Sequence, residues 1–279
     1  MMTWVCILNL LVPIGAVENF LPPEKKFFQL TPQEVDELLV RLHRQFSDFK
    51  TRLYVLSQLR LATPYDFKAI GDGSGVEPKP VFRIDRTNCT AFVLTNMALA
   101  NATSYHQAES LMTYLNYYPQ PDGRNSVTYQ NRIHFTSDRL LTSPYFELIT
   151  DRLVPAEQLD TIHLVLNRQS DGTHFLPIDW EKEITLPYIP RQFITPALLS
   201  KFPSVCGIGV IQKELFPKGI AIAHEGILFH QTDFFHASRD TGKLIKEDFL
   251  RYSKKRKKGS LTPVCDGIVV YEMKEVRTK

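Results

Sequence analysis

The order in which helical and strand patterns follow each other constrains the fold of this chain most. Residues 31–34 (TPQE) form a capping box with proline at the first helical position. Apolar residues then recur at helical spacing, and they are Val35, Leu38, Leu39, Leu42 and Phe46. We predict a second helix from about Asp48 to Gln58 and a third that begins at Cys89 and ends near Asn101.

Strand patterns dominate the second half of the chain. They are short β-branched or apolar runs separated by Gly, Pro, Asp and Lys, and they cover residues 162–166, 207–212, 221–229, 234–237 and 267–273. One more helix is predicted near residues 247–252. Helices followed by closely spaced strands predict an α+β fold, with N-terminal helices packed on an antiparallel sheet.

Length and charge set only broad limits on function. The chain has 279 residues, a formal net charge of +3 and a pI of about 8.6. This length allows one domain with a large core, and the charge is too small to indicate a nucleic-acid partner.

The N-terminus carries the only targeting pattern. Residues 5–17 are mostly apolar and end near the small residues Gly15 and Ala16, as in a secretory signal, and they are too few to span a bilayer. We predict a signal peptide at 1–17, a single catalytic domain at 18–279, and a periplasmic or secreted mature chain without an integral membrane segment. The alternative is a buried N-terminal strand.

Cys89 and two histidines form the outline of a nucleophilic site. Cys89 opens a predicted helix, and the positive end of a helix dipole favours a thiolate. His224 and His236 fall on two predicted strands joined by the short loop at 229–233, so a hairpin would bring them together. We predict Cys89 as nucleophile, His224 as base and His236 as its orienter. The alternative is two histidines with ordinary core or surface roles.

These motifs resemble a known family. Asn88-Cys89-Thr90, His224-Glu225-Gly226-Ile227 and His236-Ala237-Ser238 are similar to the motifs of NlpC-type papain-like cell-wall hydrolases. The resemblance is closer to the N-acetylmuramoyl-L-alanine amidase-like subfamily, first catalogued as a domain of unknown function. Three further segments match that subfamily in order, and they are residues 63–65 (TPY), 132–138 (RIHFTSD) and 188–190 (YIP).

The resemblance implies an activity on peptidoglycan fragments (muropeptides). The bond cleaved would be the amide between the lactyl group of N-acetylmuramic acid and L-Ala of the stem peptide. By carry-over, Cys89 is the nucleophile, His224 the base and His236 the third residue, in a papain-like fold with insertions. Tyr65 matches a family tyrosine close to the cysteine and is expected to contact the substrate.

Asn88 bears on which bond is cut. Many NlpC-type endopeptidases have Asp at this position, which pairs with the free amine of L-Ala. The neutral Asn88 fits an acylated, uncharged nitrogen better. It therefore favours the amidase over the alternative, a γ-D-glutamyl-L-diamino acid endopeptidase.

Two polar segments have competing interpretations. Arg132 and His134 are candidates for the wall of the substrate groove, or they belong to a loop braced by Arg–Asp pairing. The basic run at 254–258 (KKRKK) is either a solvated loop or a site for an anionic polymer.

Other classes of function remain open at this stage. One is a thiol acyltransferase of the same fold, and another is a non-catalytic module that binds glycan or a partner. No metal, cofactor or nucleic-acid motif is present, so we expect none of these ligands. Cys206 and Cys265 either form a disulfide or are two buried thiols, and oligomeric state leaves no signal in the sequence.

Overall fold

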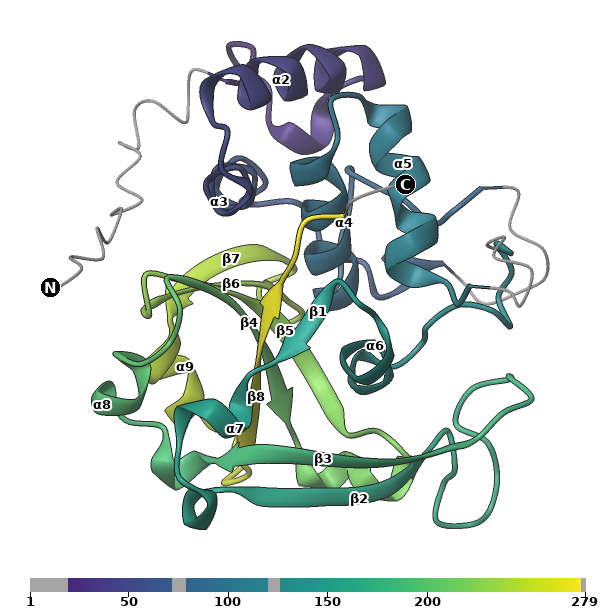
Figure 1. Ribbon diagram of the computed structural model, residues 1–279, viewed down its shortest axis with the longest axis vertical. Helices are drawn as coiled ribbons and strands as arrows, with labels where there is room; N and C mark the ends of the chain where they lie inside the picture. Colours follow the sequence, from purple (N-terminus) through teal and green to yellow (C-terminus); the bar gives the residue numbers. More distant parts are fainter. Residues whose placement is uncertain (1–19, 72–78, 120–125, 277–279) are drawn as a thin grey trace, which may run out of the picture.

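The N-terminal helices gather on one side of an antiparallel sheet (Figure 1). The computed structural model describes residues 20–71, 79–119 and 126–276. The α-helices in this part of the chain are α2 (Pro32–Gln45), α3 (Phe49–Leu59), α4 (Cys89–Asn101), α5 (Tyr105–Asn116), α6 (Thr136–Thr142), α7 (Thr150–Leu153), α8 (Pro196–Leu199) and α9 (Phe249–Lys254). Short 3₁₀ turns are η1 (Phe27–Gln29), η2 (Phe67–Ile70), η3 (Ala156–Gln158), η4 (Arg191–Phe193) and η5 (Lys213–Lys218).

The sheet confirms the predicted α+β class. Its strand order is β2-β3-β8-β4-β5-β6-β7, β1 pairs with β8, and every pairing is antiparallel. The strands are β1 (Phe146–Leu148), β2 (Asp160–Leu166), β3 (Lys182–Pro190), β4 (Val205–Ile211), β5 (Ile222–Phe229), β6 (Asp233–Ser238), β7 (Lys243–Asp248) and β8 (Gly267–Met273). The predicted hairpin forms, because β5 and β6 pair directly on either side of a short turn.

Capping side chains determine where the first two helices begin. Thr31 accepts the Glu34 backbone N–H, and Glu34 in turn accepts the Thr31 N–H at 2.8 Å, so the predicted capping box is confirmed. Asp48 caps α3 by accepting the Thr51 N–H at 2.7 Å. Both helices therefore begin within one residue of their predicted starts.

Helix α4 is the central helix of the molecule. Ten of its residues are buried, from Ala91 to Ala100, so it has no polar face. It packs against α3 and α5 on one side and against β5 and β6 on the other. A helix surrounded in this way is hydrophobic all round, and its first residue is fixed relative to the two strands.

Both faces of the sheet are covered, as alternating residues of the hairpin show. Phe229 and Phe235 join the hydrophobic cluster that contains Phe92 of α4. Their neighbours Leu228 and Phe234 join a second cluster, which contains residues of α7, α8 and α9. Side chains of successive strand residues point to opposite faces, so each strand contributes to both clusters.

The helix predicted near residues 247–252 begins two residues later in the structure, at Phe249. Glu247 and Asp248 end strand β7, where Glu247 pairs with Phe234 of β6. Helix α9 begins at Phe249 because Asp248 accepts the Arg251 backbone N–H at 2.7 Å. Pairing with β6 thus takes precedence over local helix propensity.

The signal peptide predicted at the N-terminus stays a prediction. Residues 1–17 lie outside the described part of the chain. Among the described residues, no helix is both long and apolar enough to cross a membrane.

Candidate active site

Cys89 is the first residue of α4, and its predecessor anchors the helix start. The Asn88 side chain accepts the Ala91 backbone N–H at 2.8 Å through Oδ1. Its Nδ2 donates to the Phe67 carbonyl at 2.9 Å. Both polar ends of Asn88 are therefore engaged within the protein, and the residue fixes the position of Cys89 relative to η2. Its role in substrate binding stays a prediction.

The thiol is less acidic than its place on the helix suggested. Burial raises the pKa of Cys89 to about 11, and the negative charge of Glu225 adds to the shift. Hydrogen bonds from Glu225 and Thr90 backbone groups act in the opposite direction and are weaker. A thiol with a raised pKa needs a base that accepts its proton as the sulfur reacts.

Three side chains from three adjacent strands form a continuous hydrogen-bonded chain. His224 Nε2 on β5 lies 2.9 Å from His236 Nδ1 on β6. His236 Nε2 lies 2.9 Å from Glu247 Oε1 on β7. His236 is 4% exposed, so this chain is shielded from solvent at its centre. The structure therefore brings the two predicted histidines together and adds an acid that the sequence interpretation missed.

Aromatic rings enclose the two histidines. Phe234 stacks on His236 with ring centroids 4.8 Å apart, and Tyr252 of α9 lies 5.1 Å from His236 and 6.3 Å from His224. Burial in this setting lowers the pKa of His224 to about 3, and His236 contributes to the shift. His224 is consequently a neutral imidazole across the physiological range.

Two neighbours of His224 are also neighbours of the thiol. Glu225, the next residue on β5, donates a backbone hydrogen bond to Cys89. Tyr252, which packs on the His224 ring, has a pKa raised chiefly by burial, then by Cys265 and Glu247, and to a smaller extent by Cys89. Within the described residues, no hydrogen bond joins Cys89 directly to His224. The transfer of a proton from Cys89 to His224 therefore stays a prediction.

Tyr65 lies close to Cys89. It forms a parallel β-bridge with Thr87, two residues before the cysteine, and its N–H donates to the Gly242 carbonyl at 2.8 Å. Its pKa is raised by burial and then by Cys89. Tyr65 therefore lies near the thiol, and its contact with the substrate stays a prediction.

Arg132 and His134 lie farther along, in the segment before α6. Arg132 is 2% exposed, and its guanidinium packs against Gly71 and 5.1 Å from the centre of the Tyr129 ring. His134 Nε2 lies 2.7 Å from the Tyr129 carbonyl oxygen, and burial lowers the pKa of His134 to about 4. Both side chains are tied into the local fold, and their contribution to a substrate groove stays a prediction.

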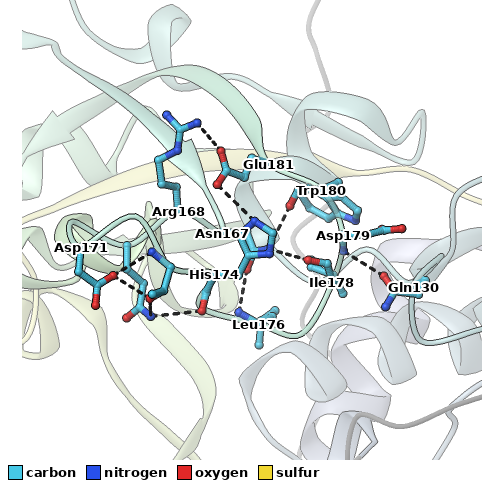
Figure 2. Close-up of polar contacts among 12 residues, drawn as sticks. Gln130, Asn167, Arg168, Asp171, His174, Leu176, Ile178, Asp179, Trp180 and Glu181 are labelled. Atoms are coloured by element: carbon cyan, nitrogen blue, oxygen red, sulfur yellow. Dashed lines mark hydrogen bonds and ion pairs between the residues drawn. The ribbon is translucent and has the colours of Figure 1, made fainter.

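The loop between β2 and β3 braces this segment (Figure 2). Gln130 donates to the Pro177 carbonyl and accepts the Asp179 N–H, at 3.1 and 3.3 Å. Asn167, which has a positive φ of 67°, holds the loop through the carbonyl of Trp180 and the N–H of Leu176.

The other face of β5 carries a buried ion pair. Glu225 accepts hydrogen bonds from Arg139 at 2.5 Å, Thr136 at 2.8 Å and Tyr271 at 2.9 Å. Arg139 and Glu225 are both fully buried. Glu225 points away from His224, since side chains alternate along a strand and the partners of Glu225 belong to α6 and β8. A carboxylate amid apolar strand residues was the sequence signal for such a pair.

The basic run at 254–258 is partly neutralised within the protein. Lys255 pairs with Glu247, and Lys257 pairs with Glu214. Arg256 donates to the Leu261 carbonyl at 2.7 Å. These contacts fix the run against the body of the protein, and they connect Lys255 to the histidine chain through Glu247.

The other two cysteines in the described part of the chain are buried thiols. Cys206 and Cys265 are both free, so the disulfide alternative is not realised. Cys265 Sγ lies 3.4 Å from the Gly267 carbonyl. In the described part of the chain, no group of three or more His, Cys, Asp and Glu residues has the arrangement of a metal site.

Comparison with known proteins identifies relatives. The AmiA-like family, described as N-acetylmuramoyl-L-alanine amidase-like, matches residues 55–261. A Legionella pneumophila protein of known structure has a TM-score of 0.65 at 18% identity, covering 88% of this chain and 97% of that one. An N-acetylmuramoyl-L-alanine amidase from Bacteroides uniformis has a TM-score of 0.58 at 17% identity, covering 81% and 99%. No curated protein sequence matches the chain.

Proposed function

Because this chain belongs to the AmiA-like family of N-acetylmuramoyl-L-alanine amidase-like proteins, we propose that it is a cysteine amidase of muropeptides. It cleaves the amide between the lactyl group of N-acetylmuramic acid and L-Ala. The observation that carries the proposal is the hydrogen-bonded pair of His224 on β5 and His236 on β6, with Cys89 at the start of α4, the helix that packs against these two strands. A papain-like arrangement places the nucleophile on a helix and the base on the sheet.

Each group has one role in the proposed reaction. Cys89 Sγ attacks the lactyl carbonyl carbon while His224 accepts the thiol proton. His224 then returns this proton to the nitrogen of L-Ala, so the stem peptide leaves with a free amine and a thioester remains on Cys89. Water attacks the thioester with His224 as base, which regenerates the thiol and releases the muramic acid carboxyl group.

The electrostatics of the site suit this sequence of steps. With the pKa of Cys89 near 11 and that of His224 near 3, the resting pair is neutral. The proton therefore moves during attack rather than before it. The carbonyl oxygen of the substrate gains charge at the start of α4, where a helix leaves its first backbone N–H groups unpaired. The Cys89 N–H is the donor that we assign to this oxygen.

Substrate contacts are assigned by position. Tyr65 lies near the thiol and is proposed to contact the substrate carbonyl. Arg132 and His134 are proposed to form one wall of the groove, through the segment braced by the β2–β3 loop. Asn88 is proposed to affect substrate binding indirectly, because it caps the start of α4 and thereby positions Cys89.

The family supports the substrate class and the compartment. Cell-wall amidases act on peptidoglycan, so we propose that this protein works outside the cytoplasm, in the periplasm or after secretion. The signal peptide at 1–17 remains part of this proposal.

Mass spectrometry of defined muropeptides tests the reaction. We expect wild-type protein to release intact stem peptide, cut before L-Ala, and Cys89→Ala to release none. Cys206→Ala removes a buried thiol of β4 and is the matched control, with unchanged turnover expected. A cut after D-Glu would identify an endopeptidase instead. Transfer to an added amine in preference to water would identify an acyltransferase, and turnover by Cys89→Ala would refute the cysteine mechanism.

A further inference from the structure

Glu247 ends the chain of hydrogen bonds that starts at His224. Its Oε1 lies 2.9 Å from His236 Nε2, and its Oε2 accepts from Lys255. Burial opposes ionisation, yet hydrogen bonds from His236 and Lys255 lower the pKa of Glu247 to about 2. Each carboxylate oxygen thus has its own donor, which fixes the charge and the orientation of Glu247.

A carboxylate at this place determines which nitrogen of each ring carries hydrogen. An ionised carboxylate only accepts hydrogen bonds, so His236 must be protonated at Nε2. A neutral His236 then has an acceptor at Nδ1, and His224 must donate to it from Nε2. A neutral His224 is left with its lone pair on Nδ1, which is the nitrogen able to accept a thiol proton.

The opposite arrangement would disable the base. If His236 carried its hydrogen on Nδ1, His224 would accept it at Nε2 and would carry its own hydrogen on Nδ1. That nitrogen would have no lone pair for the proton of Cys89. A neutral or absent residue at 247 leaves both arrangements accessible, since either ring can then reverse its hydrogen pattern.

We infer that Glu247, held by Lys255, is a positioning residue that sets the tautomers of His236 and His224 and thereby presents His224 Nδ1 as the base. This inference rests on the proposed roles of Cys89 and His224. Glu247 lies on the far side of His236 from His224. Its negative charge raises the pKa of His224 and so favours the imidazolium that forms when His224 accepts the thiol proton. Two other titratable groups lie close to this chain: Tyr252, which packs on both rings, and Lys255, which pairs with Glu247.

The test uses the full chain in two measurements that need no muropeptide. Long-range ¹H–¹⁵N spectra report the tautomer of each ring, and His236→Asn assigns the signals. We expect wild-type protein at neutral pH to have hydrogen on Nε2 of both His224 and His236. Glu247→Gln should produce a mixture of tautomers and slow the alkylation of Cys89 by iodoacetamide about tenfold. The kcat for muropeptide should fall with KM unchanged.

Glu214→Gln is the matched control. Glu214 pairs with Lys257 in the same basic run, so the variant removes an equivalent charge without touching the histidines. Its tautomers and alkylation rate should equal those of wild type. Hydrogen on Nδ1 of His236 in wild-type protein would overturn the inference, even if Glu247→Gln did not fold. So would an alkylation rate unaffected by Glu247→Gln. If the tautomers are as expected and wild type cleaves no muropeptide, the proposed function fails while the role of Glu247 stands.

Discussion

His224 Nε2 and His236 Nδ1 lie 2.9 Å apart across the β5–β6 hairpin. The ladder pairs Phe229 with Asp233 and Ile227 with Phe235, so the two histidines are not directly opposite each other. Their rings meet edge to face at 86°, which allows the nitrogen of one ring to point at the nitrogen of the other. Such a contact fixes the orientation of a base that has few other polar partners.

Substitution of His236 should separate orientation from charge. In His236→Ala the acceptor for His224 is lost, and we expect kcat to fall about 10³-fold with little change in KM. In His236→Asn the amide oxygen takes nearly the position of Nδ1, so the loss should be only about tenfold. Steady-state kinetics on a defined muropeptide would measure both. Equal losses in the two variants would show that the hydrogen bond to His224 is not what His236 supplies.

The start of α4 and the β5–β6 hairpin were accessible from sequence because their determinants are local. Asn88 caps a helix within three residues, and a two-strand hairpin brings together residues only a few positions from its turn. A run of apolar residues after Cys89 completes the first pattern, and β-branched and aromatic residues complete the second. The helix start and the hairpin could therefore be predicted from short segments.

Features that depend on distant partners could not be predicted in this way. Glu225 meets Arg139 of α6 and Tyr271 of β8, and no spacing rule links these positions. The pKa of Cys89 follows from its burial, which outweighs the helix start that was visible in the sequence. Strand β3 was missed because Pro187 interrupts its pattern. Only Ile189 and Pro190 of β3 pair with β8. Pro187, which has no backbone N–H to donate, therefore lies outside the β3–β8 ladder.

The free energy of unfolding should fall as the pH drops from about 6.5 to about 4. Burial holds the pKa of His134 near 4, whereas in the unfolded chain it returns to about 6.5. Between these values the unfolded chain binds a proton that the folded chain excludes, so stability is lost as pH falls and is regained as pH rises. The share of His134 is about 3 kcal/mol, and His224 acts in the same direction.

Urea denaturation at pH 7 and pH 4.5 would measure this dependence. His134→Gln should reduce the difference between the two pH values, since glutamine does not titrate. His106→Gln is the control, because the His106 side chain is 87% exposed, and it should keep the wild-type difference. An unchanged pH dependence in His134→Gln would contradict the assignment of a buried neutral ring.

Removal of Glu225 should destabilise the protein strongly. Glu225→Ala leaves the fully buried guanidinium of Arg139 without its counter-charge, and a broken buried pair costs about 3–5 kcal/mol. Arg139→Met together with Glu225→Leu removes both charges, and this double variant should cost less than the sum of Arg139→Met alone and Glu225→Leu alone. Thermal and urea unfolding of wild type, the two single variants and the double variant give the coupling energy.

Arg152→Ala is the control for an exposed ion pair. It breaks the pair with Glu147 and should cost less than about 1 kcal/mol. Additive single-variant losses would show that Arg139 and Glu225 do not stabilise each other.

Substitution of Asn88 tests whether this residue selects the bond that is cut. Asn88→Asp keeps the acceptor for the Ala91 N–H, so the helix cap should be retained, but it loses the hydrogen bond to the Phe67 carbonyl and the melting temperature should fall. A carboxylate beside the thiol should further raise the pKa of Cys89 and slow its alkylation by iodoacetamide. It should also favour muropeptides with a free L-Ala amine, because a charge-assisted pair becomes available.

A competition assay would measure this choice as a ratio of products. Equal amounts of a muramoyl peptide and of a stem peptide with a free L-Ala amine are offered to wild type and to Asn88→Asp, and mass spectrometry counts the two cuts. Ser104→Ala removes a comparable cap from α5, where Ser104 accepts the Gln107 N–H at 3.1 Å. It should cost about 1 kcal/mol of stability and leave the product ratio unchanged. If Asn88→Asp also left the ratio unchanged, Asn88 would act on the reaction only as the cap that positions Cys89.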